Sequence, residues 1–139
     1  MRILGGYTGS GKTKLLHQLK ANGHQTIDLE SLASHKGSVF GDSEIPQPLH
    51  EDFQNNLLSI WLSLDPEQKV WIEEKGPFLG KVGLPKSLYE KMLLAPLTHL
   101  EMPFEERMKN ILQIYGHFDQ SRFKSALRSL ESRMGTSDN

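Results

Sequence analysis

The residues with the clearest chemical meaning form an eight-residue segment near the start of the chain, Gly6-Tyr7-Thr8-Gly9-Ser10-Gly11-Lys12-Thr13. The segment matches the phosphate-binding pattern G-x-x-x-x-G-K-[ST], the P-loop, at every fixed position. Glycines let the backbone curl, so that several N–H groups and the positive end of the following helix point at one phosphate. Lys12 is expected to contact the terminal phosphates, and the Thr13 hydroxyl to help hold Mg²⁺. The predicted phosphate-binding set is Gly6, Thr8, Gly9, Ser10, Gly11, Lys12 and Thr13.

A glycine-rich strand-to-helix turn with an accidental Lys-Thr pair is the alternative interpretation of this segment. The context favours the P-loop, because the short apolar run 2–5 precedes it and an amphipathic stretch carrying Leu15, Leu16 and Leu19 follows it. The motif predicts a ligand that bears phosphate. It does not distinguish ATP, GTP or another diphosphate, and it does not imply hydrolysis.

Four carboxylates are candidates for the acid that a magnesium-bound phosphate ligand requires near its P-loop. Glu73 and Glu74 follow the apolar run 70–72 and are the leading pair for Mg²⁺. Asp28 and Glu30 are their rivals at the end of the second predicted strand, where positions 28 and 30 share a face and could hold a metal-bound water or a substrate hydroxyl. For each of the four, a solvated charge or a helix cap is an equally good interpretation.

Two further groups of residues are candidates for contacts with a substrate or a second anion. The segment His35, Lys36, Gly37 and Ser38 leaves the second predicted strand at the edge of the sheet where ligands bind in folds of this type. On spacing alone, a surface turn is the better interpretation of this segment. Arg107 lies on a predicted helix, from which it could reach developing phosphate charge. An arginine at that spacing is more often a solvated helix residue.

The alternation of strands and helices positions these candidates. Apolar runs predict strands at 2–5, 26–29, 70–72 and 97–101, and helical periodicity predicts helices after the P-loop, at 49–64, at 86–94, from Pro103 onward and from Phe123 to Met134. Residues 30–48 and 76–85, rich in glycine and proline, are expected to be loops. This order predicts a P-loop NTPase-like α/β fold, a parallel sheet with helices on both faces. We expect one such domain over 1–134 and a polar, disordered tail over 135–139.

Composition narrows the class of protein. The chain has 139 residues with 16 Lys and Arg against 17 Asp and Glu, a net charge of -1, so it is not a strongly basic protein that coats nucleic acid. It has no cysteine, which excludes disulfides, thiolate metal sites and any chemistry that needs its own thiol. The six histidines show no ligand spacing, so no histidine metal site is predicted. Without a membrane-length apolar run or a secretory signal, a cytoplasmic protein with no membrane or DNA partner is expected.

Several segments together resemble the P-loop domain of bacterial tRNA 2-selenouridine synthases. The P-loop itself is generic, but the segment Leu29–Gly41, L-E-S-L-A-S-H-K-G-S-V-F-G, is much more specific. The resemblance extends over Gln47-Pro48 with Phe53, over Val70–Glu74, over Glu101–Arg107 and to Tyr115-Gly116, and so covers nearly the whole chain. The family usually has a Ser-Arg pair after the two glutamates, where this chain has Lys75-Gly76.

The resemblance implies a transferase that modifies tRNA. Members of the family convert 2-thiouridine at the wobble position to 2-selenouridine with selenophosphate as donor, through a geranylated intermediate made from geranyl diphosphate. The implied partners are tRNA and a rhodanese domain with the catalytic cysteine. Because this chain has no cysteine, the resemblance leaves three alternatives: a fragment, one half of a split enzyme, or a relative with its own role. By itself this chain would be incomplete for selenation.

Two other classes of function remain open at this stage. One is an ATP-dependent kinase of the shikimate or nucleoside monophosphate type, in which Asp28 positions the acceptor hydroxyl and Arg107 acts from a lid. The other is a nucleotide-binding switch module without chemistry. Both would use Lys12 and Thr13 to hold Mg²⁺ with ATP or GTP, although no N-K-x-D signature supports guanine.

Overall fold

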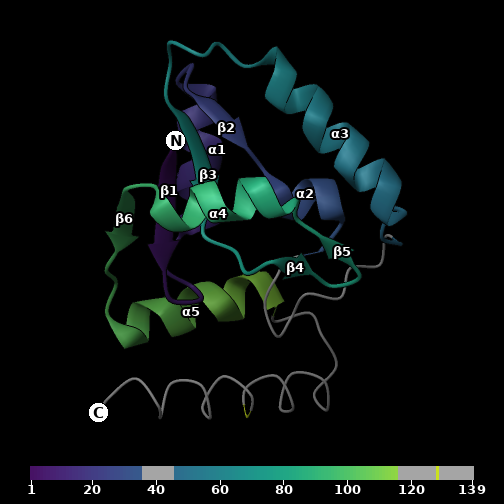
Figure 1. Cartoon of the computed structure of the whole chain (residues 1–139). Coiled ribbons are helices and arrows are strands. Elements are labelled where there is room, and N and C mark those ends of the chain that lie inside the picture. The colour runs from purple at the N-terminus through teal and green to yellow at the C-terminus, as the bar shows by residue number, and fades with distance from the viewer. Residues whose placement is uncertain (36–45, 116–127, 129–139) are drawn as a thin grey trace.

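The computed structural model describes residues 1–35, 46–115 and 128 of the chain (Figure 1). The strands are β1 (Arg2–Gly6), β2 (Gln25–Ile27), β3 (Val70–Glu73), β4 (Phe78–Leu79), β5 (Val82–Gly83) and β6 (Leu97–Leu100). The helices are α1 (Lys12–Ala21), α2 (Leu29–Ala33), α3 (His50–Ser63), α4 (Lys86–Leu94) and α5 (Phe104–Tyr115).

The main sheet has the strand order β2-β3-β1-β6, and each neighbouring pair is parallel. Ile3 of the inner strand β1 pairs with Ile72 of β3 on one side and with Leu97 of β6 on the other. All four predicted strands are therefore present in one parallel sheet, and their carboxyl ends lie at the same edge. In Figure 1 this edge is the lower one, and α5 runs beneath it.

Helices cover both faces of the sheet, as predicted. The larger core lies between one face, which contributes Ile3 and Ile72, and helices α2, α3 and α4, where Phe53 of α3 is completely buried. On the other face α1 packs against β1, β2 and β3, and its Leu16 is buried with Leu4 of β1. Figure 1 shows α4 in front of the sheet and α1 behind it. The two layers fix the loop between β1 and α1 at the carboxyl edge.

The segment after β2 differs from the prediction of a strand through Leu29 and a loop from residue 30. The strand ends at Ile27, and α2 begins at Leu29. Asp28 caps this helix, because its side chain accepts a hydrogen bond from the Ser31 backbone N–H at 3.1 Å. Capping satisfies an N–H that the helix leaves unpaired, and this local gain outweighs the apolar strand pattern. The prediction that Asp28 and Glu30 share one face of a strand is therefore wrong.

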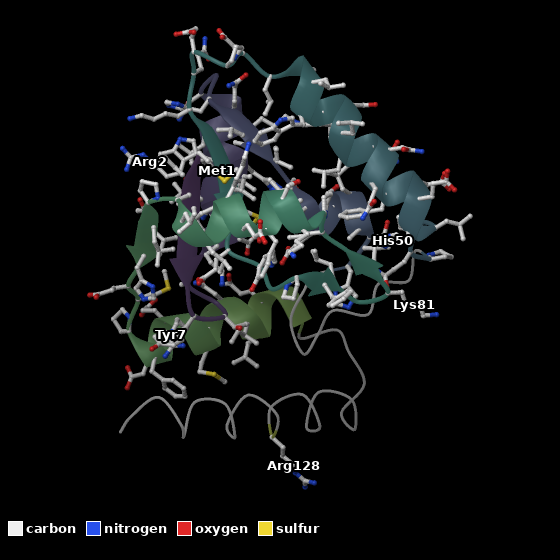
Figure 2. All side chains as sticks on the ribbon, in the orientation of Figure 1. Met1, Arg2, Tyr7, His50, Lys81 and Arg128 are labelled. Carbon is white, nitrogen blue, oxygen red and sulfur yellow. The ribbon has the colours of Figure 1, made fainter. Side chains whose placement is uncertain are left out.

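The predicted loop over 76–85 contains the two-stranded hairpin β4-β5. Gln47 attaches this hairpin to α2: its Nε2 donates to the carbonyls of Ala33, at 2.9 Å, and Leu79, at 2.8 Å, and its Oε1 accepts from the Lys81 backbone N–H at 2.9 Å. His50 at the start of α3 accepts from the Gly83 N–H at 3.2 Å, and Figure 2 labels His50 on α3 and Lys81 on the hairpin. The hairpin is thus fastened to two helices by side chains.

Replacing Gln47 with alanine should lower the free energy of unfolding by about 2–3 kcal/mol, because three hydrogen bonds of about 1 kcal/mol each are lost. Urea denaturation of the variant and the parent protein measures the change. Gln54→Ala is the matched control, since Gln54 makes one long bond, to the Gly83 carbonyl at 3.4 Å. A Gln47 variant no less stable than the Gln54 variant would refute a role for Gln47 in holding the hairpin.

The last part of the predicted fold lies partly outside the described residues. The helix predicted after Pro103 is α5, whose first turn holds Glu105 and Glu106. The helix predicted from Phe123 to Met134 and the tail 135–139 lie outside the described residues, as does most of the predicted loop, 36–45. Among the helices that the structure describes, none is long and apolar enough to cross a membrane.

Candidate functional site

The predicted P-loop connects β1 to α1 at the carboxyl edge of the sheet. Three of its glycines have positive φ angles that side chains rarely adopt: Gly6 at 147°, Gly9 at 83° and Gly11 at 92°. Gly11 is the N-cap of α1 and has no side chain with which to cap it. The first N–H groups of α1 therefore face the loop, in the arrangement that binds phosphate at a helix N-terminus.

Lys12 folds back across this loop. Its Nζ donates a hydrogen bond to the Gly6 carbonyl at 2.5 Å. Burial lowers the pKa of the Lys12 ammonium, and the nearby Glu73 carboxylate opposes part of that change. The ammonium is thus held at the mouth of the loop by a carbonyl that an anionic ligand could replace.

Thr13 and Glu73 bring two oxygen atoms together beside the loop. The Thr13 hydroxyl donates to Glu73 Oε2 at 3.3 Å, although the two residues lie 60 positions apart. Glu73 ends β3, the strand next to β1, and is only 4% exposed. A hydroxyl and a carboxylate are hard oxygen ligands of the kind that Mg²⁺ takes. In the described part of the chain, no group of three or more His, Cys, Asp or Glu could hold a metal, so water and ligand phosphates would have to complete the coordination.

The second glutamate of the predicted metal pair, Glu74, makes different contacts. Glu74 is exposed, and its backbone N–H donates to the Leu4 carbonyl at 2.7 Å. Its Oε2 lies 2.8 Å from the position that a Cβ on Gly5 would take. Of the predicted pair, Glu73 is the carboxylate in contact with the Thr13 hydroxyl, so it is the better placed to share a metal with it.

Lys75 joins Glu73 to α2 through a buried ion-pair network. Its Nζ donates to Glu30 Oε1 and lies 3.5 Å from Glu73 Oε1. The three side chains are 8%, 15% and 5% exposed for Lys75, Glu30 and Glu73. Buried charges that compensate one another are fixed in position, because moving one would leave another unpaired. In the sequence, Lys75 stands out only as the residue in place of the family's Ser-Arg pair.

Glu30 makes this network sensitive to pH. Burial raises the pKa of the Glu30 carboxyl, and Lys75 opposes part of the rise. The folded state thus holds the Glu30 proton more tightly than the unfolded chain. The stability that this proton contributes is complete below the ordinary glutamate pKa of about 4.3 and is lost as pH rises through the folded-state pKa.

We therefore expect Glu30→Gln, which cannot ionise, to gain stability relative to the parent protein as the pH is raised from 4 to 7. Urea denaturation of both proteins across this range measures the difference in free energy of unfolding. Glu105→Gln, which removes an exposed carboxylate on α5, should show no such trend. A difference between Glu30→Gln and the parent that stays constant with pH would contradict the expectation.

Apart from Arg107, the remaining predicted site residues lie on or next to α2 and the hairpin, or outside the described residues. Asp28, besides capping α2, lies 3.0 Å from His17 Nε2 on α1. The imidazole of His35 lies against the hairpin, with Cδ2 2.8 Å from the Cβ position of Gly80. Lys36, Gly37 and Ser38 lie outside the described residues. Of the two rival carboxylates, therefore, Glu30 joins the network at Glu73 and Asp28 contacts His17.

Arg107 and its neighbours bring α5 against the P-loop. The Arg107 carbonyl lies 2.5 Å from the Cβ position of Gly9, so only glycine fits there. One turn on, Asn110 Nδ2 donates to the Gly9 carbonyl at 2.8 Å. The Arg107 guanidinium lies over the ring of Tyr7, with Cζ 4.9 Å from its centroid. Sequence patterns do not reveal this contact, because it joins the first loop to a helix about a hundred residues later.

Two buried polar atoms have no hydrogen-bond partner within the described residues: Ser10 Oγ in the P-loop and Arg107 Nε beside it. Buried polar groups are nearly always paired, and leaving one unpaired costs free energy. Ser10 Oγ lies within the loop, 2.6 Å from the Cβ position of Gly6, whereas Arg107 belongs to α5. Each atom keeps hydrogen-bonding capacity that no described residue uses.

Comparisons with known proteins identify one family across nearly the whole chain. The family model described as "tRNA 2-selenouridine synthase AAA domain" matches residues 1–136. Similar curated relatives are the tRNA 2-selenouridine synthases of Cupriavidus pinatubonensis, 33% identical over 96% of this chain, and Sulfurovum sp., 38% identical over 98%. That of Salmonella arizonae is 40% identical over 81% of the chain.

The chain spans only 41%, 37% and 31% of the length of these three relatives. Among solved structures, AMPPCP-bound DnaA from Aquifex aeolicus matches 97% of this chain and 53% of its own, with a TM-score of 0.42 and 16% identity. Because that TM-score is low, the P-loop fold rests on the parallel sheet and the loop geometry described above. The extent of the family match and the identity to these relatives show that the chain belongs to the family of the tRNA 2-selenouridine synthase AAA domain.

Proposed function

We propose that this domain binds the diphosphate of a ligand at its P-loop and so contributes to the conversion of 2-thiouridine to 2-selenouridine in tRNA. The observation that carries the proposal is the arrangement of Lys12, Thr13 and Glu73 around the first N–H groups of α1. A cation, a hydroxyl and a buried carboxylate surround one anion-binding loop. The unpaired Ser10 hydroxyl adds a donor to it.

Each residue has a distinct part in binding. Gly6, Thr8, Gly9 and Gly11 belong to the loop backbone whose N–H groups would receive a phosphate. The ammonium of Lys12 would leave the Gly6 carbonyl for the terminal phosphate. Thr13 and Glu73 would hold Mg²⁺, which would neutralise charge on the diphosphate. Lys75 and Glu30 keep the Glu73 carboxylate in place.

Geranyl diphosphate is the diphosphate that we favour over ATP and GTP. In the transfer of its geranyl group to the sulfur of 2-thiouridine, the bond between the first carbon and the diphosphate oxygen breaks as the carbon–sulfur bond forms. Negative charge then accumulates on the departing diphosphate. Donors fixed around that group stabilise this charge more than the charge of the bound reactant, which is what lowers the barrier.

The relatives' printed names support tRNA as the second substrate. Residues 1–134 would act as one P-loop domain in the cytoplasm, and a cysteine-bearing rhodanese domain would complete selenation. A kinase loses support because Asp28, the residue meant to position its acceptor, caps α2 and contacts His17.

Calorimetric titration with geranyl diphosphate, Mg-ATP and Mg-GTP tests the proposal. We expect geranyl diphosphate to bind at least about tenfold more tightly than either nucleotide. Inorganic pyrophosphate with Mg²⁺ is the control that separates diphosphate binding from recognition of the geranyl chain. A preference for Mg-ATP would overturn the choice of ligand, and absence of binding by all four would overturn the proposal.

The role of Glu73 is tested through the magnesium dependence of pyrophosphate binding. With a carboxylate at this position, Mg²⁺ should strengthen binding, because the metal can use Thr13 and Glu73 together. In Glu73→Gln, which keeps the shape but removes the charge, this enhancement should fall by about tenfold or more. Glu74→Gln is the matched control, and an equal loss in both variants would contradict the assignment of the metal to Glu73.

A further inference from the structure

Four side chains from three elements gather beside the P-loop and form what we term the aromatic cluster: Tyr7, His99, Phe104 and Arg107. The Arg107 guanidinium lies over the Tyr7 ring at 4.9 Å and over the Phe104 ring at 5.6 Å, measured from Cζ to each centroid. His99 of β6 meets the Tyr7 ring edge-on, with centroids 5.7 Å apart and planes at 88°. Figure 2 shows Tyr7 at the lower end of β1, beside α5.

The aromatic cluster is open to solvent. Tyr7 is 52% exposed and Phe104 is 53% exposed. Rings whose only role was to pack α5 onto the sheet would be more deeply buried, because burial is the source of their stabilisation. Large aromatic rings left half exposed next to a binding loop are typical of an interaction site.

Arg107 adds hydrogen-bonding capacity to this surface. Its Nε is buried and has no partner among the described residues. The guanidinium contacts both rings, and the helix that carries it is anchored by the bond from Asn110 to the Gly9 carbonyl. A guanidinium that lies over two rings can donate from its terminal nitrogens to the edge atoms of a base that stacks on an exposed ring.

We propose that the aromatic cluster stacks an unpaired base of RNA beside the P-loop. Unpaired RNA bases are recognised by stacking on aromatic rings and arginine planes and by hydrogen bonds to their edges. The cluster supplies two rings and an imidazole on which a base can stack, and a guanidinium that can donate to base edges or to a backbone phosphate. From Tyr7 the chain continues directly into the loop that would receive the diphosphate. The base would thus lie next to the group transferred to it.

This inference rests on the proposed function, in which tRNA and a diphosphate meet at one site. The chemistry of the cluster favours a base over a prenyl chain, because a hydrocarbon offers no hydrogen-bond acceptor to the Arg107 guanidinium. A site for an aliphatic chain would also be expected to be lined by leucine or valine side chains in place of an arginine. A prenyl chain that packed on Tyr7 would be revealed by loss of geranyl diphosphate binding in the test below.

The experiment measures binding of the full 139-residue chain to a fluorescent single-stranded oligouridine and to an abasic oligonucleotide of the same length and backbone. We expect Tyr7→Leu to weaken oligouridine binding by about tenfold, within the range of 5- to 150-fold that loss of one stacked base gives. Binding of the abasic oligonucleotide should not change. Tyr7→Phe, which keeps the ring, should bind as the parent does, and Phe78→Leu controls for removal of an exposed ring outside the cluster.

Three results would overturn the inference. Equal weakening of both oligonucleotides by Tyr7→Leu would mean that the cluster acts on the backbone alone, and no weakening of either would mean that it only packs α5. A loss of geranyl diphosphate binding in Tyr7→Leu with pyrophosphate binding intact would assign the cluster to the prenyl chain instead. Pyrophosphate titration of the same samples reports the P-loop separately, so failure of the proposed function would appear there and not in the oligouridine arm.

Discussion

Lys12→Ala is expected to weaken pyrophosphate and geranyl diphosphate binding by about 100-fold and to leave the thermal midpoint of the ligand-free protein unchanged or higher. The loss follows from removing charge-assisted hydrogen bonds to the terminal phosphate, each stronger than a neutral one. The unchanged or higher midpoint follows from burial, which lowers the pKa of Lys12 because it disfavours the ammonium in the folded protein. The two effects are measured by calorimetric titration and by thermal denaturation without ligand.

Lys14→Ala is the matched control for charge. Lys14 lies two positions further along α1 and is exposed, so its removal changes the net charge equally without reaching into the loop. Its affinity for pyrophosphate should stay within about threefold of the parent's, as expected when an exposed charge is screened. If the two lysine variants lost affinity equally, general electrostatic attraction would explain binding and the P-loop assignment would fail.

Gly9→Ala is expected to impair both stability and ligand binding. A Cβ at this position would lie 2.5 Å from the Arg107 carbonyl and 3.0 Å from Ile111 Cγ1, so α5 would have to move. The left-handed φ of 83° adds backbone strain of about 1–2 kcal/mol. We expect the free energy of unfolding to fall by about 3 kcal/mol or more, a strong effect for one methyl group, together with pyrophosphate affinity.

Gly11→Ala separates the effect of backbone strain from the effect of the steric clash with α5. Gly11 has a similar φ of 92°, but nothing lies within 4 Å of its Cβ position. This variant should lose only the strain of about 1–2 kcal/mol. Urea denaturation gives both losses, and hydrogen exchange of α5 amides should accelerate in Gly9→Ala alone. Similar exchange of α5 in the two variants would show that the contact between Gly9 and Arg107 does not hold the helix.

Local patterns in the sequence were sufficient to predict the sheet and its loop. The P-loop is recognisable because glycine, lysine and threonine occupy fixed positions between an apolar run and a helical stripe, and all of these lie within about twenty residues. The strand 70–72 and the helix 49–64 are likewise defined by short-range periodicity. Such features depend on neighbours along the chain, and the structure confirms them.

Contacts between distant segments could not be predicted in the same way. Lys75 reaches Glu30 across 45 positions, and Gln47 joins the end of α2 to a hairpin, although neither contact leaves a periodic pattern. Asp28 illustrates a local competition: the apolar residues around it favour a strand, while its side chain can cap a helix, and the cap prevails. The metal candidates Glu73 and Glu74 are adjacent in sequence, so the sequence alone could not show that Glu73 is the one in contact with Thr13.

The hydrogen bond between Asn110 and the Gly9 carbonyl has a consequence for the order of events during synthesis on the ribosome. The two residues are 101 positions apart, and β6, the strand beside β1, is also made late, at residues 97–100. A nascent chain that has emerged only as far as α4 contains the whole P-loop sequence but lacks both structures that pack against it. Capacity to bind a diphosphate should therefore arise abruptly once α5 leaves the exit tunnel, long after the motif itself has been translated.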